Sequence, residues 1–273
     1  MSISDDYHRN GYVVLKSLFS DDEISSWRSR IEQLSGISKD DFDSEKSPKW
    51  TRPSGPSTDD RFFSAILNNN LLNNLKQIFG KDLKYLHHND LHAGFGAHGY
   101  HRDSVYRGTK GQDFEESEEP YLVCRVAVYL QTFKESGFKF GIVPRSHRMT
   151  SLMTRIETST PFSKLKKLLG LPELIFTKQD WIATEPGDAI IFDTRCWHRG
   201  GLVTGPKYSF FIGYGVQNSH FNRHWNYYSE ARTDLDYSPP SEDLVEQLRA
   251  EGLWPEHDID DGGGFSGAFL PNQ

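Results

Sequence analysis

The sequence predicts a mainly β protein, a jelly roll or a β-sandwich, with α-helices packed against one sheet. Short runs of β-forming residues recur between residues 83 and 217, and turn residues such as Pro186-Gly187-Asp188 separate them. Two segments with helical periodicity precede these runs. Many short strands at this spacing are typical of sandwiches and jelly rolls.

The expected organisation is a single domain over residues 1–273, a length that one large domain can fill. Helices are expected over about 20–80, the β core over about 83–217 and a C-terminal extension over about 218–273. No internal repeat and no convincing linker divides the chain.

The first expected elements are a strand over Tyr12–Leu15 and a helix over about 21–34. Ser20 can cap the start of this helix while Glu23 reaches back, which is the capping-box pattern. Apolar residues recur on one face of the helix. They are Ile24, Trp27, Ile31 and Leu34.

Residues 36–60 are rich in Ser, Asp, Lys and Pro and are expected to form a surface loop. A second helix is expected over about 62–79, where apolar residues again recur at helical spacing. Two helices ahead of the strands would cover one face of a sheet.

Six later runs are expected to be strands, and a helix over about 162–169 would interrupt them. The acidic, polar segment 111–119 is expected to be a solvated insertion, with a lid as the alternative. The expected strands are 84–95, 121–132, 138–143, 180–184, 189–198 and 208–216.

Charge and hydropathy exclude several classes of function. The formal net charge is -7 at pH 7, and no Lys/Arg block of the usual length is present, so a nucleic-acid partner is not expected. No apolar run is long enough to span a bilayer, so no membrane partner is expected either. The oligomeric state stays open.

The expected compartment is the cytoplasm. The N-terminus is polar and acidic, with neither the basic start nor the apolar core of a signal peptide. Cys124 and Cys196 lie in apolar strand-like runs, so we expect buried free thiols, which suit a reducing compartment.

A candidate metal site begins at His101-Arg102-Asp103, where an imidazole and a carboxylate stand two residues apart. On an extended segment this spacing points both side chains to the same side. His198 ends an expected strand just before Gly200-Gly201, and is well placed to line the mouth of a barrel. Two His and one carboxylate occupy one face of an octahedral ion and leave three positions open, which suits oxygen activation at non-haem iron(II).

Other interpretations of these residues stay open. A His-x-Asp sequence is common by chance, and a His at a strand end is often only a half-buried polar residue. His92, His98 and His220 could also enter a ligand set. His98 is the strongest of these rivals, but its spacing of three residues before His101 suits a helix better than this Gly-rich segment.

Several motifs resemble those of the phytanoyl-CoA dioxygenase family of iron(II)/2-oxoglutarate oxygenases and occur in that family's order. The resemblance implies a double-stranded β-helix, with iron(II) held by His101, Asp103 and His198 and with 2-oxoglutarate as co-substrate. The motifs are Gly11–Leu15, His101–Ser104, Val126–Gln131, Gly141–His147, Pro186–Asp188 and Phe192–Gly201.

Two positions depart from the family pattern. Lys207 stands where the family usually has an Arg for the distal carboxylate of 2-oxoglutarate, and Ser209 would share its face. A Lys pairs with a carboxylate as a point charge, without the bidentate fork of Arg. Arg145 stands where the family commonly has Gly, and His147 is expected to shape that turn.

Arg125 is the rival cation for 2-oxoglutarate. Cys124, Val126 and Val128 share the apolar face of its strand, so Arg125 faces the other way, toward the barrel interior. A buried charge needs a partner, so a carboxylate is expected beside it. That carboxylate would belong either to 2-oxoglutarate or to a structural salt bridge.

The resemblance implies a dioxygenase that hydroxylates a small organic molecule with dioxygen and releases succinate and carbon dioxide from 2-oxoglutarate. A halogenase of the same family would need a small residue in place of the carboxylate ligand, and Asp103 argues against it. A catalytically silent jelly roll that binds a metal or another ligand is the alternative from a different class. The sequence does not identify the primary substrate.

Overall fold

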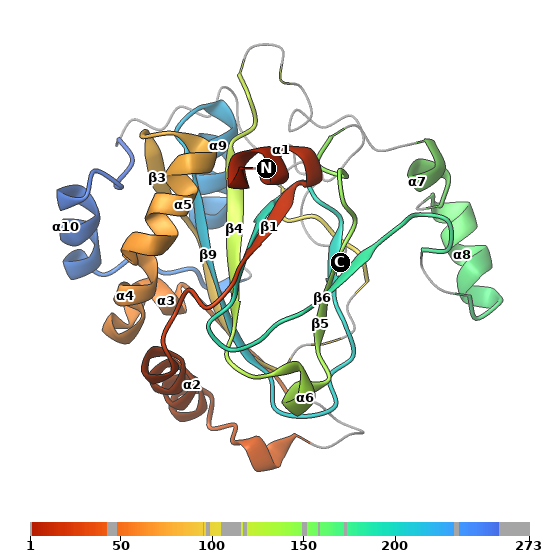
Figure 1. Ribbon diagram of the computed structural model, residues 1–273, viewed down its shortest axis with the longest axis horizontal. Helices are drawn as coiled ribbons and strands as arrows, with labels where there is room; N and C mark the ends of the chain where they lie inside the picture. Colours follow the sequence, from red (N-terminus) through yellow and green to blue (C-terminus); the bar gives the residue numbers. More distant parts are fainter. Residues whose placement is uncertain are drawn as a thin grey trace.

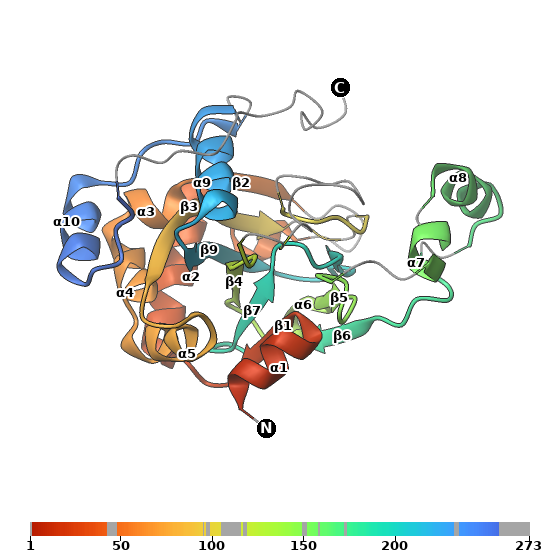
Figure 2. The same cartoon turned by 90° about the horizontal axis from the view of Figure 1, so that it is seen from above.

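The computed structural model describes residues 2–42, 48–94, 96, 99–104, 116, 119–148, 152–157, 159–171, 174–231 and 235–256. Two antiparallel sheets face each other, and helices cover the outer side of the larger sheet (Figures 1 and 2). The expected fold, a mainly β jelly roll of the double-stranded β-helix type with flanking helices, is confirmed.

The larger sheet has the strand order β1-β7-β4-β9-β3-β2, and the smaller sheet has the order β6-β5-β8. Neighbours in the sheets are mostly distant in the sequence, as jelly-roll crossovers require. The strands are β1 (Tyr12–Leu15), β2 (Lys49–Pro53), β3 (Leu83–Gly94), β4 (Val123–Tyr129), β5 (Lys139–Ile142), β6 (Asp180–Ala183), β7 (Ala189–Asp193), β8 (His198–Gly200) and β9 (Tyr208–Val216).

Strand alternation divides the core into two parts, as the sequence predicted for β4. Cys124, Val126 and Val128 point into the main core, between the larger sheet and the helices. Cys124 is a buried free thiol, as the sequence predicted. Ala127 and Tyr129 point between the two sheets. Cys196, which is also free and buried, lies in this inner cluster.

Helix α2 (Asp21–Ser35) forms as its start signal predicted. The Ser20 hydroxyl accepts a hydrogen bond from the backbone N–H of Glu23, and the Glu23 carboxylate accepts one from the backbone N–H of Ser20. Trp27 of this helix is 1% exposed and meets the Phe210 ring of β9 edge-on, with the ring centres 5.2 Å apart. This contact fixes the helix on the outer face of the larger sheet.

The second expected helix, over 62–79, is not continuous. It is divided into η2 (Asp60–Phe62), α4 (Phe63–Ile66) and α5 (Asn69–Phe79). The Asn68 side chain accepts a hydrogen bond from the backbone N–H of Leu71 and so begins a new helix. The apolar spacing continues across this break, which is why periodicity alone missed it.

The expected loop over 36–60 was also partly wrong. It contains η1 (Lys39–Asp41), β2 and α3 (Gly55–Thr58). Strand β2 pairs with β3 at the edge of the larger sheet, and its side chains are largely exposed or half-buried. An edge strand of this kind carries no clear apolar alternation, so composition resembled that of a loop.

The remaining helices lie at the N-terminus, between strands and in the C-terminal part. The expected helix over 162–169 is present as α8. Most of the segment 111–119, whose role as insertion or lid was left open, lies outside the described residues. The remaining helices of the described residues are α1 (Ile3–Asn10), α6 (Phe133–Ser136), α7 (Leu152–Glu157), α8 (Thr160–Leu168), α9 (Ser219–Asn226), η4 (Tyr227–Ala231) and α10 (Glu242–Ala250).

Candidate active site

A turn after Asp193 places His198 in the smaller sheet. The sequence predicted one strand over 189–198, but β7 ends at Asp193 and His198 begins β8. The Asp193 carboxylate accepts hydrogen bonds of 2.8 Å from the backbone N–H and from the guanidinium of Arg195. This carboxylate stabilises the turn, whereas the apolar Cys196 and Trp197 prolonged the strand pattern in the sequence.

His101 and His198 lie opposite each other in an isolated antiparallel bridge. The backbone N–H of each donates to the carbonyl oxygen of the other, both at 3.0 Å, and the ring centres are 4.4 Å apart. In each ring Nδ1 lies 3.0 Å from the carbonyl oxygen two residues earlier, that of Gly99 or Cys196. An Nδ1–H donor there leaves the Nε2 lone pair available to a metal.

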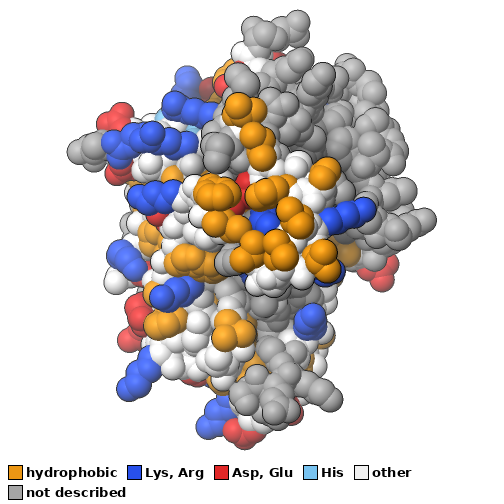
Figure 3. Space-filling model, turned by 90° about the vertical axis from the view of Figure 1, so that its right-hand side faces the viewer, with side chains coloured by type: hydrophobic (Ala, Val, Ile, Leu, Met, Phe, Trp, Pro, Cys, Tyr) orange, Lys and Arg blue, Asp and Glu red, His pale blue; other side chains and the backbone are white. Residues whose placement is uncertain are grey.

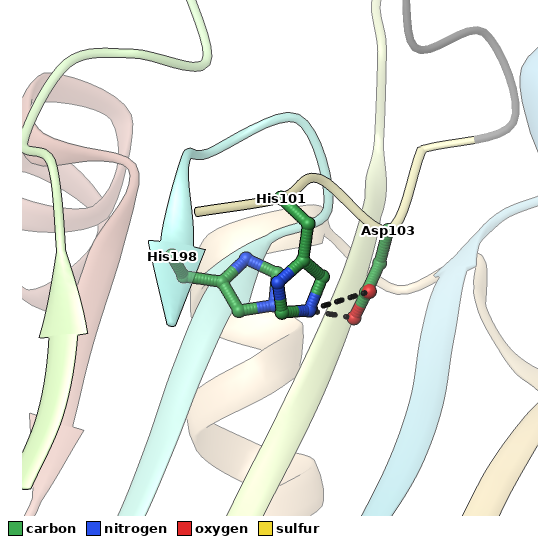
Figure 4. Close-up of side chains that lie close together, drawn as sticks. All are labelled: His101, Asp103 and His198. Carbon is green, nitrogen blue, oxygen red and sulfur yellow. Dashed lines mark ion pairs between the residues drawn. The ribbon is translucent and has the colours of Figure 1, made fainter. Parts of the chain in front are cut away.

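Asp103 brings a carboxylate to the same point (Figure 4). The Nε2 atoms of His101 and His198 lie 3.8 and 3.6 Å from its carboxylate oxygens. Its backbone N–H donates to the carbonyl oxygen of Thr194, so the turn that places His198 also places Asp103. Candidate ligand atoms of the three residues lie within 4.8 Å of one another.

The protonation states suit a metal site. Burial together with the neighbouring His101 lowers the pKa of His198 to about 4, so this imidazole is neutral at pH 7. Burial raises the pKa of Asp103, but His198 and Arg125 outweigh it and hold that pKa well below its usual value. A neutral imidazole and an ionised carboxylate are the forms that bind metal.

Arg125 lies between two carboxylates of the chain itself. One terminal nitrogen donates to Asp103 at 2.9 Å and the other to Asp90 at 2.5 Å. The Tyr237 hydroxyl donates to the second oxygen of Asp90 at 2.6 Å. The carboxylate expected beside Arg125 is therefore present, and it comes from the protein.

Lys207 is a buried cation in a different environment. It is 2% exposed, and its Nζ donates to the carbonyl oxygen of Gly94 at 2.8 Å and to the Ser209 hydroxyl at 3.3 Å. It also lies over the rings of Phe138 and Tyr129. Burial lowers the pKa of Lys207 to about 7, and no carboxylate of the described residues forms an ion pair with it.

One pocket joins these groups. His101, Asp103, His198, Arg125 and Lys207 all line it, and its empty volume is about 500 Å³. The other lining residues are His92, Tyr129, Phe138, Phe140, Gly200 and Phe211.

The other histidines are placed differently. His92 lines the pocket but does not belong to the cluster of possible ligands found among the described residues. His220 lies on α9, with its Nε2 3.3 Å from the carbonyl oxygen of Glu119. His98 lies outside the described residues.

The turn at residues 144–147 follows the expectation from the sequence. Arg145 has a φ of 67°, in the left-handed region that favours glycine. This backbone conformation explains the glycine that the family pattern commonly has at this position. His147 is buried, and its Nε2 lies 3.2 Å from the carbonyl oxygen of His8. His147 therefore shapes and anchors the turn.

Comparisons with known proteins agree with this geometry. A family model described as phytanoyl-CoA dioxygenase (PhyH) matches residues 7–208. A comparison with curated proteins finds no match. No helix of the described residues has the length and apolar character needed to cross a membrane.

Three solved structures illustrate the similarity in fold. SnoK, a non-haem α-ketoglutarate-dependent carbocyclase from nogalamycin biosynthesis, is 13% identical with a TM-score of 0.56, over 79% of this chain and 83% of that chain. The epimerase SnoN, in complex with Fe3+, α-ketoglutarate and nogalamycin RO, is 13% identical with a TM-score of 0.54, over 79% and 82%. HygX from Streptomyces hygroscopicus, with nickel and 2-oxoglutarate bound, is 18% identical with a TM-score of 0.54, over 77% and 84%.

Proposed function

Because this chain belongs to the phytanoyl-CoA dioxygenase (PhyH) family, we propose that it is an iron(II)- and 2-oxoglutarate-dependent dioxygenase that hydroxylates a small organic molecule. The observation that carries the proposal is one pocket that contains both a His-Asp-His cluster and the buried cation Lys207. HygX with nickel and 2-oxoglutarate, and SnoN with Fe3+ and α-ketoglutarate, support this cofactor pair.

Iron(II) would be held by Nε2 of His101, Nε2 of His198 and a carboxylate oxygen of Asp103. When bound, the metal supplies the reaction of dioxygen with 2-oxoglutarate that yields succinate, carbon dioxide and an oxidised substrate. The protein's own part is to keep the three donors on one side of the ion and the other side open. Arg125 contributes by holding Oδ2 of Asp103 and by keeping that carboxylate ionised.

The distal carboxylate of 2-oxoglutarate would pair with Lys207. The Ser209 hydroxyl lies 3.3 Å from Nζ and could bind the same carboxylate, while Phe138 and Tyr129 exclude water around the pair. Arg125 suits this role less well, because Asp90 and Asp103 already occupy both of its terminal nitrogens.

The test of this function is succinate formation. Protein supplied with iron(II), 2-oxoglutarate, dioxygen and a panel of small organic substrates should produce succinate, and Asp103→Ala should abolish it. The product decides the reaction type: hydroxylation adds one oxygen atom to the substrate, whereas epimerisation, the activity described for SnoN, leaves its mass unchanged. A protein that binds iron(II) and 2-oxoglutarate but forms no succinate with any substrate would support the silent binding protein instead.

Asp90→Asn tests whether the buried ion pairs position Asp103. The change removes one of the two charges beside Arg125, so we expect a loss of about 1–3 kcal/mol in the free energy of unfolding. We also expect about tenfold weaker iron(II) binding, as for other residues that orient a metal ligand. Tyr237→Phe, which keeps both charges and removes only one hydroxyl, is the control. If Asp90→Asn lowers stability and leaves iron affinity unchanged, Asp90 has a structural role alone.

A further inference from the structure

A helical arm, made up of the described residues between 152 and 179, projects away from the jelly roll between β5 and β6 (Figures 1 and 2). Ten large hydrophobic residues are exposed in the described part of the chain, and eight of them lie on this arm. Leu168 is 82% exposed and Phe176 is 63% exposed. The eight are Leu152, Ile156, Leu165, Leu168, Leu169, Leu171, Ile175 and Phe176. A concentration of apolar surface like this marks an interaction site.

Hydrogen bonds to the buried Glu157 side chain hold the loop at residues 175–177 in place. The Glu157 carboxylate accepts hydrogen bonds from the backbone N–H groups of Ile175, Phe176 and Thr177. The Lys166 ammonium donates to the carbonyl oxygen of Glu157 at 2.7 Å. Ile175 and Phe176 are thus presented to the outside by an ordered loop.

The charge of the arm is opposite to that of the whole chain. Its described residues expose Lys164, Lys167 and Lys178, and their only carboxylate, that of Glu157, is buried. The chain as a whole has a formal net charge of -7. On this side of the molecule, apolar side chains gather with Lys and Arg side chains around them (Figure 3).

We propose that the arm attaches the protein to an anionic membrane surface. Exposed leucines and a phenylalanine would enter the boundary between headgroups and acyl chains, and the lysines would meet acidic headgroups. Contact between the same patches of two copies would instead bring lysines against lysines. The sequence led us to expect no membrane partner, because no apolar run is long enough to span a bilayer. Attachment to a membrane surface needs no such run.

The base of the arm contacts the segment that carries a candidate metal ligand. The Tyr100 hydroxyl donates to the Gln179 side chain, and the Tyr100 ring packs with Leu174 of the arm. Tyr100 directly precedes His101. Attachment through the arm would therefore hold the catalytic pocket close to the membrane and favour a substrate drawn from it, an extension that rests on the proposed function.

The experiment is co-sedimentation of the full chain, without metal or 2-oxoglutarate, with vesicles of phosphatidylcholine alone or mixed with phosphatidylglycerol. We expect binding to the mixed vesicles that weakens with added salt. Lys164→Glu with Lys167→Glu should weaken it at least about tenfold, since each lysine near an anionic surface contributes substantially. Lys49→Glu with Lys81→Glu, the same charge change at exposed sites elsewhere, should have a much smaller effect.

Leu168→Ser with Phe176→Ser tests the apolar contribution at side chains whose exposure makes unfolding unexpected. This variant should also lose vesicle binding by about tenfold or more. The proposal is wrong if the unmodified protein does not bind mixed vesicles at low salt, or if both arm variants bind as it does. It is also wrong if the protein is a dimer that the Leu168 and Phe176 changes dissociate. Because no metal or co-substrate is present, these results are independent of the proposed reaction.

Discussion

Replacing His101 or His198 with alanine is expected to abolish tight iron(II) binding and to preserve the fold. Each change removes one of three donors whose ligand atoms lie within 4.8 Å of one another. We expect the affinity to fall more than about a hundredfold, because even residues outside the ligand set contribute 10–100-fold. Calorimetric titration with iron(II) under anaerobic conditions measures the loss.

The two substitutions differ in their structural cost. The His101 side chain is 41% exposed, so its removal should hardly change stability. His198 is buried against Phe192 and Phe140, so His198→Ala leaves a small cavity and should lower the melting temperature. The bridge between the two residues is made by backbone atoms, so both variants can keep it.

His92→Ala is the matched control for these variants. His92 lines the same pocket but does not belong to the cluster of possible ligands, so iron(II) binding should persist. Normal iron(II) affinity in both His101→Ala and His198→Ala would show that the ligand assignment is wrong. Loss of binding in His92→Ala alone would move the site toward β3.

Local patterns in the sequence predicted much of the fold. The alternation along β4 predicted that Arg125 faces the barrel interior, and the capping box at Ser20 predicted the start of α2. These features depend on a few neighbouring residues. The turn after Asp193 depends on a local carboxylate too, but the apolar residues that follow concealed it.

Contacts between distant residues could not be predicted in the same way. Asp90 and Arg125 are 35 residues apart, and Tyr237 is 147 residues from Asp90. Strand alternation places Asp90 on the interior face of β3, and a charged residue mid-strand needs a partner. Two such residues of opposite charge could have been matched, but nothing in the sequence brings Tyr237 to them.

Lys207→Ala is expected to raise the KM for 2-oxoglutarate at least ~30-fold, because it removes a charge-assisted hydrogen bond from a closed site, a loss of about 2–5 kcal/mol. Iron(II) affinity should hardly change, since Lys207 is not among the possible metal ligands. Steady-state kinetics with varied 2-oxoglutarate, together with iron titration, separates these two effects.

The pH dependence gives this prediction a second measurement. In the absence of 2-oxoglutarate, burial lowers the pKa of Lys207 to about 7. A carboxylate bound beside the amine would raise that pKa. Above pH 7 the free protein must therefore take up a proton to bind 2-oxoglutarate. The KM for 2-oxoglutarate should therefore rise by up to about tenfold per pH unit above pH 7. Calorimetry in buffers of different ionisation enthalpy should detect the proton uptake.

Two variants decide which cation binds the distal carboxylate. Lys207→Arg is charged at every accessible pH, so if it binds 2-oxoglutarate it should do so without proton uptake. Arg125→Ala should mainly weaken iron(II) binding, because Arg125 holds Asp103 and Asp90. A large KM effect from Arg125→Ala with none from Lys207→Ala would transfer the role to Arg125. No effect from either variant would mean that the distal carboxylate of 2-oxoglutarate is held elsewhere or that 2-oxoglutarate is not the co-substrate.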